Sequence, residues 1–254
     1  MTVNKISRGQ PAAYGQEIIK RRFRLAQAHT GFINKIALDF GCGNGAQTVA
    51  FQGSGCKILA VDIDRSDLQT LSNYLQAGSC HMIVPVQYDG ARLPVATAAV
   101  DLVFSFEVLE HVPDEATALR EIHRVLKPGG EIIFSVPNKG WIFETHGAHL
   151  PILPWNRVPF FSWLPRALHS RFAKARIYRK RDIAALLRQQ GFEILSIQYV
   201  TAPMDVLRNP RLKRLARALL FGSDSTRWTF LATAIFIYAV KSKEVASPRC
   251  FLPV

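Results

Sequence analysis

Apolar and polar positions alternate in blocks along most of the chain. The stretches 36–40, 57–62 and 100–106 are apolar over nearly their whole length, which is typical of parallel strands buried on both faces. Shorter or more mixed runs predict further strands at 82–86, 131–136, 192–201 and 228–241.

Segments between these strands repeat leucine and isoleucine every three or four positions, as amphipathic helices do. Asp114 stands where it can cap one helix, and Gly78 and Gly191 stand where two others end. The predicted helices cover residues 14–29, 46–51, 65–77, 115–126, 182–190 and 207–221. The alternation, with a hairpin-like finish, predicts an α/β fold: a doubly wound, Rossmann-like sheet of seven strands.

A glycine-rich turn follows the first strand. Gly41, Gly43 and Gly45 let the backbone turn tightly with no Cβ in the way of a ligand, and the next helix would point its N-terminal N–H groups at that ligand. Asp62 ends the second strand, 21 residues after Gly41, where a carboxylate can accept both hydroxyls of a ribose. The stretch 36–64 therefore predicts a pocket for a nucleoside cofactor.

The glycine spacing separates this turn from the dinucleotide-binding fingerprint. That fingerprint is G-x-G-x-x-G, whereas the glycines here run G-x-G-x-G. Asp39 stands two residues before the first glycine, and a carboxylate there suits a cationic ligand better than a pyrophosphate. The alternative to a cofactor-binding loop is a purely structural turn in some other α/β protein.

The pattern D-F-G-C-G-N-G resembles the first motif of the class I S-adenosylmethionine (SAM) methyltransferases, and Asp62 in AVDID matches their second. FSFEVLEHVPD, LREIHRVLKPGG and IIFSVPN resemble the same family at the same distances, so that residues 36–138 match it closely and 177–241 more loosely. The resemblance implies the strand order 3-2-1-4-5-7-6, with strand seven antiparallel and the ligands beyond the carboxyl ends of strands one and four.

The cofactor contacts that this resemblance implies lie on the loops after the first four strands. For Asp89, which would hold the adenine amino group, a turn-forming Asp-Gly pair is an equal alternative. The predicted SAM contacts are Asp39, Gly41, Cys42, Gly43, Gly45, Asp62, Ile63, Asp89, Gly90 and Phe106. On the first helix, Lys20, Arg21 or Arg22 can approach the methionine carboxylate, although a solvated face is the alternative for most of them.

Three histidines are candidates for removing a proton from the acceptor. His111 follows strand four, and His146 and His149 follow strand five, so all three belong to the rim of one cleft. Each histidine alone is more often structural than catalytic.

A divalent metal is a second hypothesis for the same region. On a helical turn Glu107, Glu110 and His111 would share one face, and their donors suit Mg²⁺, Mn²⁺ or Zn²⁺. The run E-V-L-E-H resembles the metal-holding element of ubiquinone-pathway O-methyltransferases and small-RNA 2′-O-methyltransferases, where His146 or His149 would complete the site. Anchoring of the helix by the glutamate and histidine is the alternative.

Length and cysteine content bound the class of protein. The 254 residues fit one domain, so we expect a single unit over 1–254. Four scattered cysteines, with no C-x-x-C pair, favour a reduced, cytoplasmic setting. The first residues lack the apolar core of a signal peptide, and the apolar run 228–240 is too short to span a bilayer.

Charge is strongly positive and unevenly placed. The formal net charge is +13, and between Arg157 and Arg217 fourteen Lys or Arg residues face three acids. Such a face suits nucleic acid, anionic lipid or an acidic metabolite, or it only keeps the protein soluble.

Two segments depart from the compact pattern. Residues 139–176 are too many for a plain connection, and their aromatic residues and prolines predict a lid over the substrate mouth, with packing on the core as the alternative. Within 203–225, the helix 207–221 alternates basic and leucine faces, which is typical of a helix that lies on a membrane or a partner.

Together these features predict a SAM-dependent methyltransferase that acts on a hydroxyl of a small, lipophilic or membrane-associated acceptor, with peripheral contact with an anionic membrane. The run Ser105-Phe106-Glu107-Val108 replaces the motif used for exocyclic amines of bases, and we expect no DNA partner. An RNA 2′-O-methyltransferase and a non-catalytic scaffold of the same fold stay open as alternatives, the first of them disfavoured by the absence of an added RNA-binding domain.

Overall fold

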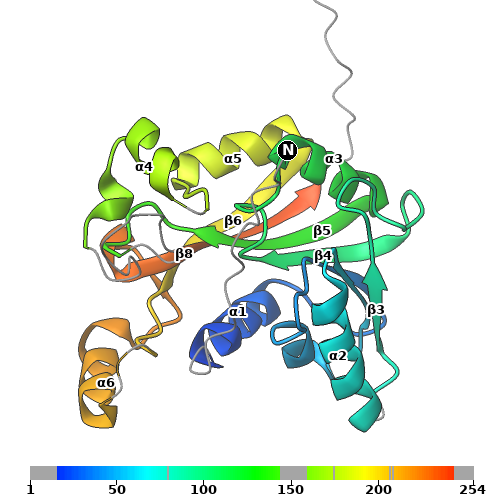
Figure 1. The fold of residues 1–254 in the computed structure, drawn as a ribbon, viewed down its shortest axis with the longest axis horizontal. Coiled ribbons are helices and arrows are strands. Elements are labelled where there is room, and N and C mark those ends of the chain that lie inside the picture. The colour runs from blue at the N-terminus through cyan, green and yellow to red at the C-terminus, as the bar shows by residue number, and fades with distance from the viewer. Residues whose placement is uncertain are drawn as a thin grey trace, which may run out of the picture.

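The computed structural model describes residues 16–78, 80–143, 159–173, 175–205, 207 and 209–242. One mixed sheet runs through this part of the chain, with the strand order β3-β2-β1-β4-β5-β8-β6-β7 (Figure 1). The strands are β1 (Ile36–Phe40), β2 (Lys57–Asp62), β3 (Ile83–Gln87), β4 (Val100–Phe106), β5 (Leu126–Pro137), β6 (Phe192–Thr201), β7 (Ser225–Thr226) and β8 (Ala232–Lys241).

The topology confirms the predicted winding. β1 pairs in parallel with β2 and β4, so the order of the strands reverses beside β1. β8 lies antiparallel between β5 and β6, as expected of the last strand. The eighth strand is the two-residue β7, which pairs with Tyr199 and Val200 of β6 and is too short to show in the sequence pattern.

Helices cover both faces of the sheet and make two cores. On one face, α3 (Glu115–Val125) and α5 (Lys180–Gln189) bury Leu119, Ile122 and Leu187 against the strands. On the other face, α1 (Gln16–His29) and α2 (Arg65–Ala77) bury their own apolar stripes, Leu71 among them. Figure 1 shows α3 and α5 above the sheet and α1 and α2 below it.

Several predicted boundaries are wrong for physical reasons. The helix expected at 46–51 is a single 3₁₀ turn, η1 (Thr48–Phe51), because Gly53 and Gly55 follow with φ of +83° and +85° and reverse the chain. β5 begins at Leu126 rather than at 131: Leu126 pairs with Val100 and Glu131 with Leu102, so the residues between them bulge out.

The C-terminal segments also differ from the expected boundaries. The predicted helix 207–221 is divided into α6 (Pro210–Ala216) and a π-helical turn, η4 (Arg217–Phe221). A 3₁₀ turn, η5 (Thr229–Leu231), precedes β8, which therefore begins at Ala232. Between β5 and α5 the structure adds η3 (Phe161–Trp163) and α4 (Arg166–Phe172).

A buried arginine ties α1 to the segment that follows β6. The guanidinium of Arg21, 2% exposed, donates to the carbonyls of Thr201 (2.9 Å), Ala202 (3.3 Å) and Phe221 (2.5 Å). Burial lowers the pKa of this guanidinium, and the nearby carboxylates of Glu17 and Asp224 oppose that shift. The bonds fix α1 against the end of β6 and against η4.

Replacing this arginine should destabilise the fold. In Arg21→Leu three carbonyls lose their buried donor, and the loss of one partner from a buried charged cluster costs about 3–5 kcal/mol of unfolding free energy. Chemical denaturation measures this difference. The matched control is Arg24→Leu, whose side chain is 46% exposed and pairs with Asp224, and which should cost about 1 kcal/mol or less. Equal losses of unfolding free energy in the two variants would show that the buried bonds of Arg21 do not stabilise the fold.

Candidate functional site

The carboxyl ends of β1 to β4 meet at one edge of the sheet, and the glycine loop after β1 occupies its centre. Gly41, Gly43 and Gly45 have φ of +80°, +52° and +83°. A Cβ on Gly41 would lie 2.4 Å from Val108 Cγ1, and a Cβ on Gly45 would lie 2.3 Å from Leu71 Cδ1. The loop is therefore closed in between α2 and the turn after β4, where L side chains do not fit.

Asp62 holds this loop from the neighbouring strand. One oxygen of its half-buried carboxylate accepts the N–H of Gly43 at 2.8 Å, and the other accepts the N–H of Asp64 at 2.9 Å. Each carboxylate oxygen has two lone-pair sites, so the same group can also accept a ligand hydroxyl.

Asp39 lies under the loop. The side chain is 2% exposed and accepts a hydrogen bond of 2.5 Å from the hydroxyl of Thr48. Burial raises the pKa of Asp39 to about 7, and the negative charge of Asp62 adds to the shift. In the structure this carboxyl joins β1 to η1; its predicted contact with the cofactor stays a prediction.

The loops after β2 and β3 come together beside the glycine loop. Ile63 is 52% exposed, and a Cβ on Gly90 would lie 3.5 Å from its Cγ2. Asp89 is exposed and accepts the N–H groups of Ala91 and Arg92, which lower the pKa of its carboxyl. Asp89 therefore stabilises a turn, near the exposed side chain of Ile63. Its predicted contact with the adenine stays a prediction.

Phe106 and Cys42 complete the set of predicted cofactor contacts. Phe106 ends β4, is 9% exposed, and carries the guanidinium of Arg22 over its ring at 5.6 Å. Cys42 is buried, and burial raises the pKa of its thiol, so it stays uncharged. All ten predicted contacts therefore lie on the loops and strand ends of this edge.

Helix α1 closes the loop from the side. The amide of Gln47, after the glycine loop, donates to the carbonyl of Ile19 at 3.3 Å. Among the described residues, two buried side-chain atoms here have no hydrogen-bond partner, the Nε donor of Arg22 and the Oε1 acceptor of Gln47. A ligand that carries both an acceptor and a donor, such as an amino-acid end, would satisfy both. Of the three candidate cations Lys20, Arg21 and Arg22, Arg22 is the one at the site, because Arg21 is buried against the carbonyls after β6 and Lys20 is exposed.

The residues after β4 form a reverse turn. Glu107 has φ of +58°, and the N–H of His111 donates to the carbonyl of Val108 at 2.9 Å. The helical turn expected for Glu107, Glu110 and His111 is therefore wrong, because the chain reverses before α3 begins. Positive φ outside glycine is uncommon and often marks a functional position.

The three side chains of this turn nevertheless lie close together. The carboxylate of Glu107 accepts from Arg22 and from the hydroxyl of Ser135, both at 2.8 Å. Glu110 is buried, and burial together with the charge of Glu107 raises the pKa of its carboxyl well above the usual range. The Nε2 of His111 lies 3.9 Å from Glu110 Oε1.

The described residues do not by themselves form the hypothesised metal site. Within the described ranges, no three His, Cys, Asp or Glu side chains are grouped as a metal site needs. Glu107 pairs with the guanidinium of Arg22 at 2.8 Å. His146 and His149, the other candidate bases and possible metal ligands, lie outside the described residues.

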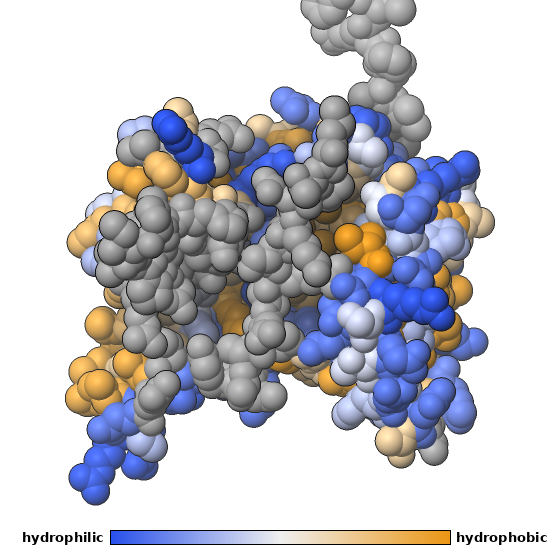
Figure 2. Space-filling view, viewed as in Figure 1, coloured by the Kyte–Doolittle hydropathy of each residue, from blue (hydrophilic) through white to orange (hydrophobic). Residues whose placement is uncertain are grey.

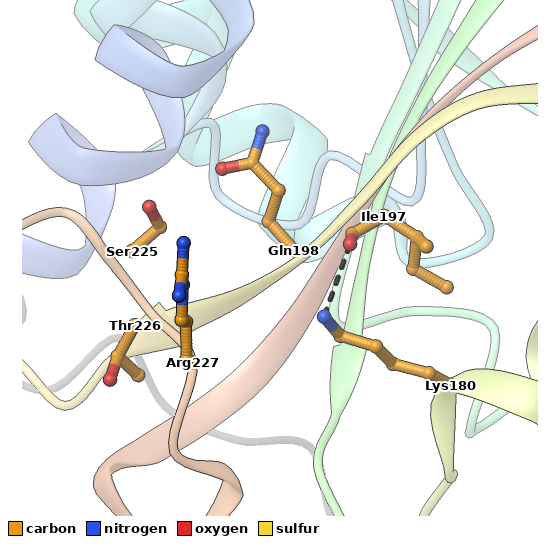
Figure 3. Close-up of a pocket in the computed structure, with 6 residues that line it drawn as sticks. All are labelled: Lys180, Ile197, Gln198, Ser225, Thr226 and Arg227. Atoms are coloured by element: carbon orange, nitrogen blue, oxygen red, sulfur yellow. Dashed lines mark hydrogen bonds between the residues drawn. The ribbon is translucent and has the colours of Figure 1, made fainter.

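Two hollows lie along the same edge toward β6, and the sequence pattern did not indicate them because distant segments form them. One, of about 490 Å³, lies beside β6 and β7; Figure 3 shows Lys180 reaching the carbonyl of Ile197 from α5, and Arg227 rising after β7. The other, of about 590 Å³, includes aromatic side chains of three segments. Its lining residues are Asn138, Lys139, Gly140, Trp163, Arg179, Lys180, Arg181, Tyr199, Thr229 and Phe230.

Part of the predicted lid lies against this second hollow. The Nζ of Lys139 donates to the carbonyls of Ser162 (3.1 Å) and Leu164 (2.8 Å), and the indole of Trp163 donates to the carbonyl of Gly140. Trp163 is 50% exposed. Residues 144–158 of the lid lie outside the described part, so a lid over the mouth stays a prediction.

Comparison with known proteins places the site in context. A family model described as a methyltransferase domain matches residues 38–134. A protein of Idiomarina loihiensis named ubiquinone biosynthesis O-methyltransferase is 31% identical over 175 residues, which cover 65% of this chain and 67% of that protein. A protein of the same name from Pseudomonas aeruginosa is 29% identical over 182 residues, covering 69% and 72% of the two chains.

Solved structures agree in fold. A SAM-dependent methyltransferase from Mesorhizobium loti superimposes with a TM-score of 0.59 at 19% identity, over 87% of this chain and 97% of that chain. A protein from Listeria monocytogenes, titled a putative SAM-dependent methyltransferase, gives 0.62 at 16% identity, over 89% and 99%. At these identities the likeness concerns the fold alone.

The buried carboxyl of Asp39 should make stability depend on pH. Its pKa is about 7 in the folded protein against an ordinary 3.8, so the unfolded chain loses this proton first and stability falls as pH rises from about 4 to 7. Asp39→Asn removes that fall. Between pH 5 and pH 8 the variant should lose about 2–3 kcal/mol less unfolding free energy than the wild type in denaturant titrations.

A matched control for this measurement is Asp101→Asn. Burial by itself would raise the pKa of Asp101, but hydrogen bonds from Lys127 and from the N–H of Ile36, together with the charges of Lys127 and Lys35, lower it overall. This carboxylate is therefore ionised in both states above pH 5, and the variant should differ from the wild type by the same unfolding free energy at both pH values. A pH slope in Asp39→Asn as steep as in the wild type would show that Asp39 is ionised in the folded protein.

Proposed function

Because the chain belongs to the class I SAM-dependent methyltransferases, we propose that it transfers the methyl group of SAM to a hydroxyl of a small, lipophilic acceptor. Membership of this family establishes methyl transfer as the reaction class and SAM as the cofactor. The choice of a hydroxyl is supported by the relatives named O-methyltransferase. The choice of a lipophilic acceptor is supported by the aromatic hollow that is lined by the residues just after β5.

The site has suitable partners for each end of SAM. Asp62 is already held by two amide donors and would accept the ribose hydroxyls, with Ile63 and Gly90 beside the adenine. The Nε of Arg22 and the Oε1 of Gln47 would meet the carboxylate and the ammonium of the methionine end. The single observation that carries this placement is that two unsatisfied buried atoms of opposite character lie beside the glycine loop.

The acceptor would enter along the ends of β5 and β6. Trp163, Tyr199 and Phe230 supply apolar and aromatic surface there, and Asn138 holds the rim by donating to the carbonyls of Thr229 and Ala232. A hollow with aromatic walls and a few polar groups is typical of small-molecule sites. Asn138, which lines the hollow, comes three residues after Ser135, and Ser135 contacts Glu107.

SAM supplies a methyl carbon already activated by a sulfonium, so the protein has to orient the acceptor and remove its proton. We assign proton removal to His111. Its imidazole is 21% exposed and lies against Glu110, whose burial keeps that carboxyl from competing as a base at neutral pH. Arg22 holds Glu107 in place, and no step requires a metal.

Cofactor affinity tests the proposed placement of SAM. Asp62→Ala leaves two ribose hydroxyls unpaired, and Arg22→Gln removes the donor to the methionine carboxylate, so each should weaken SAM binding about tenfold or more in calorimetry. Lys20→Gln, at an exposed cation two residues before Arg22 on α1, is the matched control and should bind SAM as the wild type does. Unchanged affinity in Asp62→Ala would remove the placement of SAM.

Turnover with defined acceptors tests the reaction itself. Labelled SAM should transfer its methyl group to prenylated phenols but not to the corresponding prenylated anilines, with the product identified by mass and by the position of the methyl signal in NMR spectra. His111→Ala should lower kcat about 10²-fold or more, while the exposed His81→Ala should have no effect. Methylation of the anilines instead would overturn the O-methyl assignment.

A further inference from the structure

The segment after β6 carries an exposed surface that the rest of the described chain does not cover. Neither α6 nor η4 buries a single residue. Leu212, Leu215, Leu219 and Leu220 are 51%, 55%, 71% and 61% exposed. We call these four leucines, together with Arg211, Lys213 and Arg214, the α6 surface. An amphipathic helix normally buries its apolar side against another element, and the described part of the chain provides no such element for these leucines.

Charge separates this surface from an ordinary apolar patch. From Val206 to Ser223 the sequence has five Lys or Arg residues and no Asp or Glu. Arg211 and Arg214 are exposed, next to the leucines. Figure 2 shows hydrophobic residues gathered over α6 with strongly hydrophilic ones beside them.

The base of the segment is held rigidly. Arg21 donates to the carbonyl of Phe221, and Arg24 pairs with Asp224 through two bonds of 2.6 and 2.7 Å. Arg217 donates to Asp205 and to the carbonyl of Pro203. Arg217 is thus bonded at the base, while Arg211 and Arg214 are exposed. Figure 1 shows α6 standing away from the sheet, and the bonds at the base tie the segment to α1.

The position of the segment relates it to the active site. β6 runs in the same direction as β5, because both are antiparallel to β8, so α6 leaves the sheet at the edge that carries the cofactor loops. Trp228 and Phe230 lie at this edge as well, 62% and 40% exposed, with ring centroids 5.7 Å apart. Phe230 also lines the proposed acceptor hollow.

The chemistry of the surface selects its partner. A second copy of the chain would bring like charges together on a protein with a net charge of +13. A nucleic acid would meet the cations but leave four leucines in water. An anionic bilayer accepts both, since the leucines enter the acyl region while the cations meet the headgroups. Among the described residues no helix is long and apolar enough to cross a bilayer, so contact would be peripheral.

We propose that the α6 surface docks the protein onto anionic membranes, with the mouth of the active site turned toward the lipid. The docking inference rests on the proposed function in one respect only: the uptake of a lipophilic acceptor is what docking would serve. Docking itself is measured without turnover, so the two proposals fail separately.

Flotation with vesicles tests the docking. The full chain should float with vesicles of equal parts phosphatidylglycerol and phosphatidylcholine, and not with pure phosphatidylcholine, and 0.5 M salt should weaken the binding. Leu219→Gln/Leu220→Gln should weaken it at least tenfold. Arg211→Gln/Arg214→Gln should weaken it about 30-fold, since each cation near an anionic surface contributes roughly fivefold.

Matched controls change equally exposed residues elsewhere. Leu195→Gln on β6, 52% exposed, and Arg65→Gln on α2 should float as the wild type does. Every variant should bind SAM with unchanged affinity in calorimetry, which shows that it is folded.

Three results would overturn the proposal. The first is equal binding, or no binding, to both kinds of vesicle. The second is full binding by the leucine pair variant, which would leave only a charge effect. The third is a dimer in sedimentation without lipid that the leucine pair variant abolishes, since a second copy would then be the partner.

Discussion

A carboxylate at the end of β2, that of Asp62, holds together the two loops that form the cofactor site. It accepts from Gly43 in the loop after β1 and from Asp64 in its own loop. The parallel register of β1 and β2, in which Phe40 lies opposite Val61, brings these groups to the same height. A ligand hydroxyl therefore meets an acceptor whose position is already fixed, and binding pays little for ordering it.

Other ionisable groups around this carboxylate are buried at a cost that the surrounding bonds offset. The carboxyl group of Asp39 accepts a hydrogen bond from the hydroxyl of Thr48, and the carboxylate of Glu107 accepts hydrogen bonds from Arg22 and Ser135. Burial raises the pKa of Asp39 and of Glu110, so the site carries less negative charge at neutral pH than its four acids suggest. Less repulsion then opposes a substrate hydroxyl that is losing its proton.

Helix α1 connects the cofactor loops with the periphery. Arg22 reaches Phe106 and Glu107, while Arg21 and Arg24, on the same helix, hold the base of the α6 segment. A force on α6 at a lipid surface would thus act on the helix that closes the glycine loop. The arginines of α1 thus have separate tasks: Arg22 in the site, Arg21 in the core and Arg24 at the surface.

The sequence by itself determined the sheet, the winding and the cofactor loop. Apolar runs and glycine positions are local signals, and they placed β4 and β6 at the observed residues and Asp62 beside the glycines. Tertiary structure alone decided which side chains meet. Periodicity could not show that Glu107 enters a reverse turn with a positive φ, because its partners Ser135 and Arg22 come from distant parts of the chain.

The same reason explains why the pattern missed Gln47 and could not choose Arg22 among the three cations that it offered. Gln47 and Arg22 have unsatisfied atoms where α1 packs on the glycine loop, and the aromatic hollow exists only where η3, β6 and η5 come together. Such contacts join residues far apart in the chain, and their geometry depends on packing that no local spacing encodes. The exposed leucines of α6 are the converse case: the sequence marks them as apolar, and only the fold leaves them in solvent.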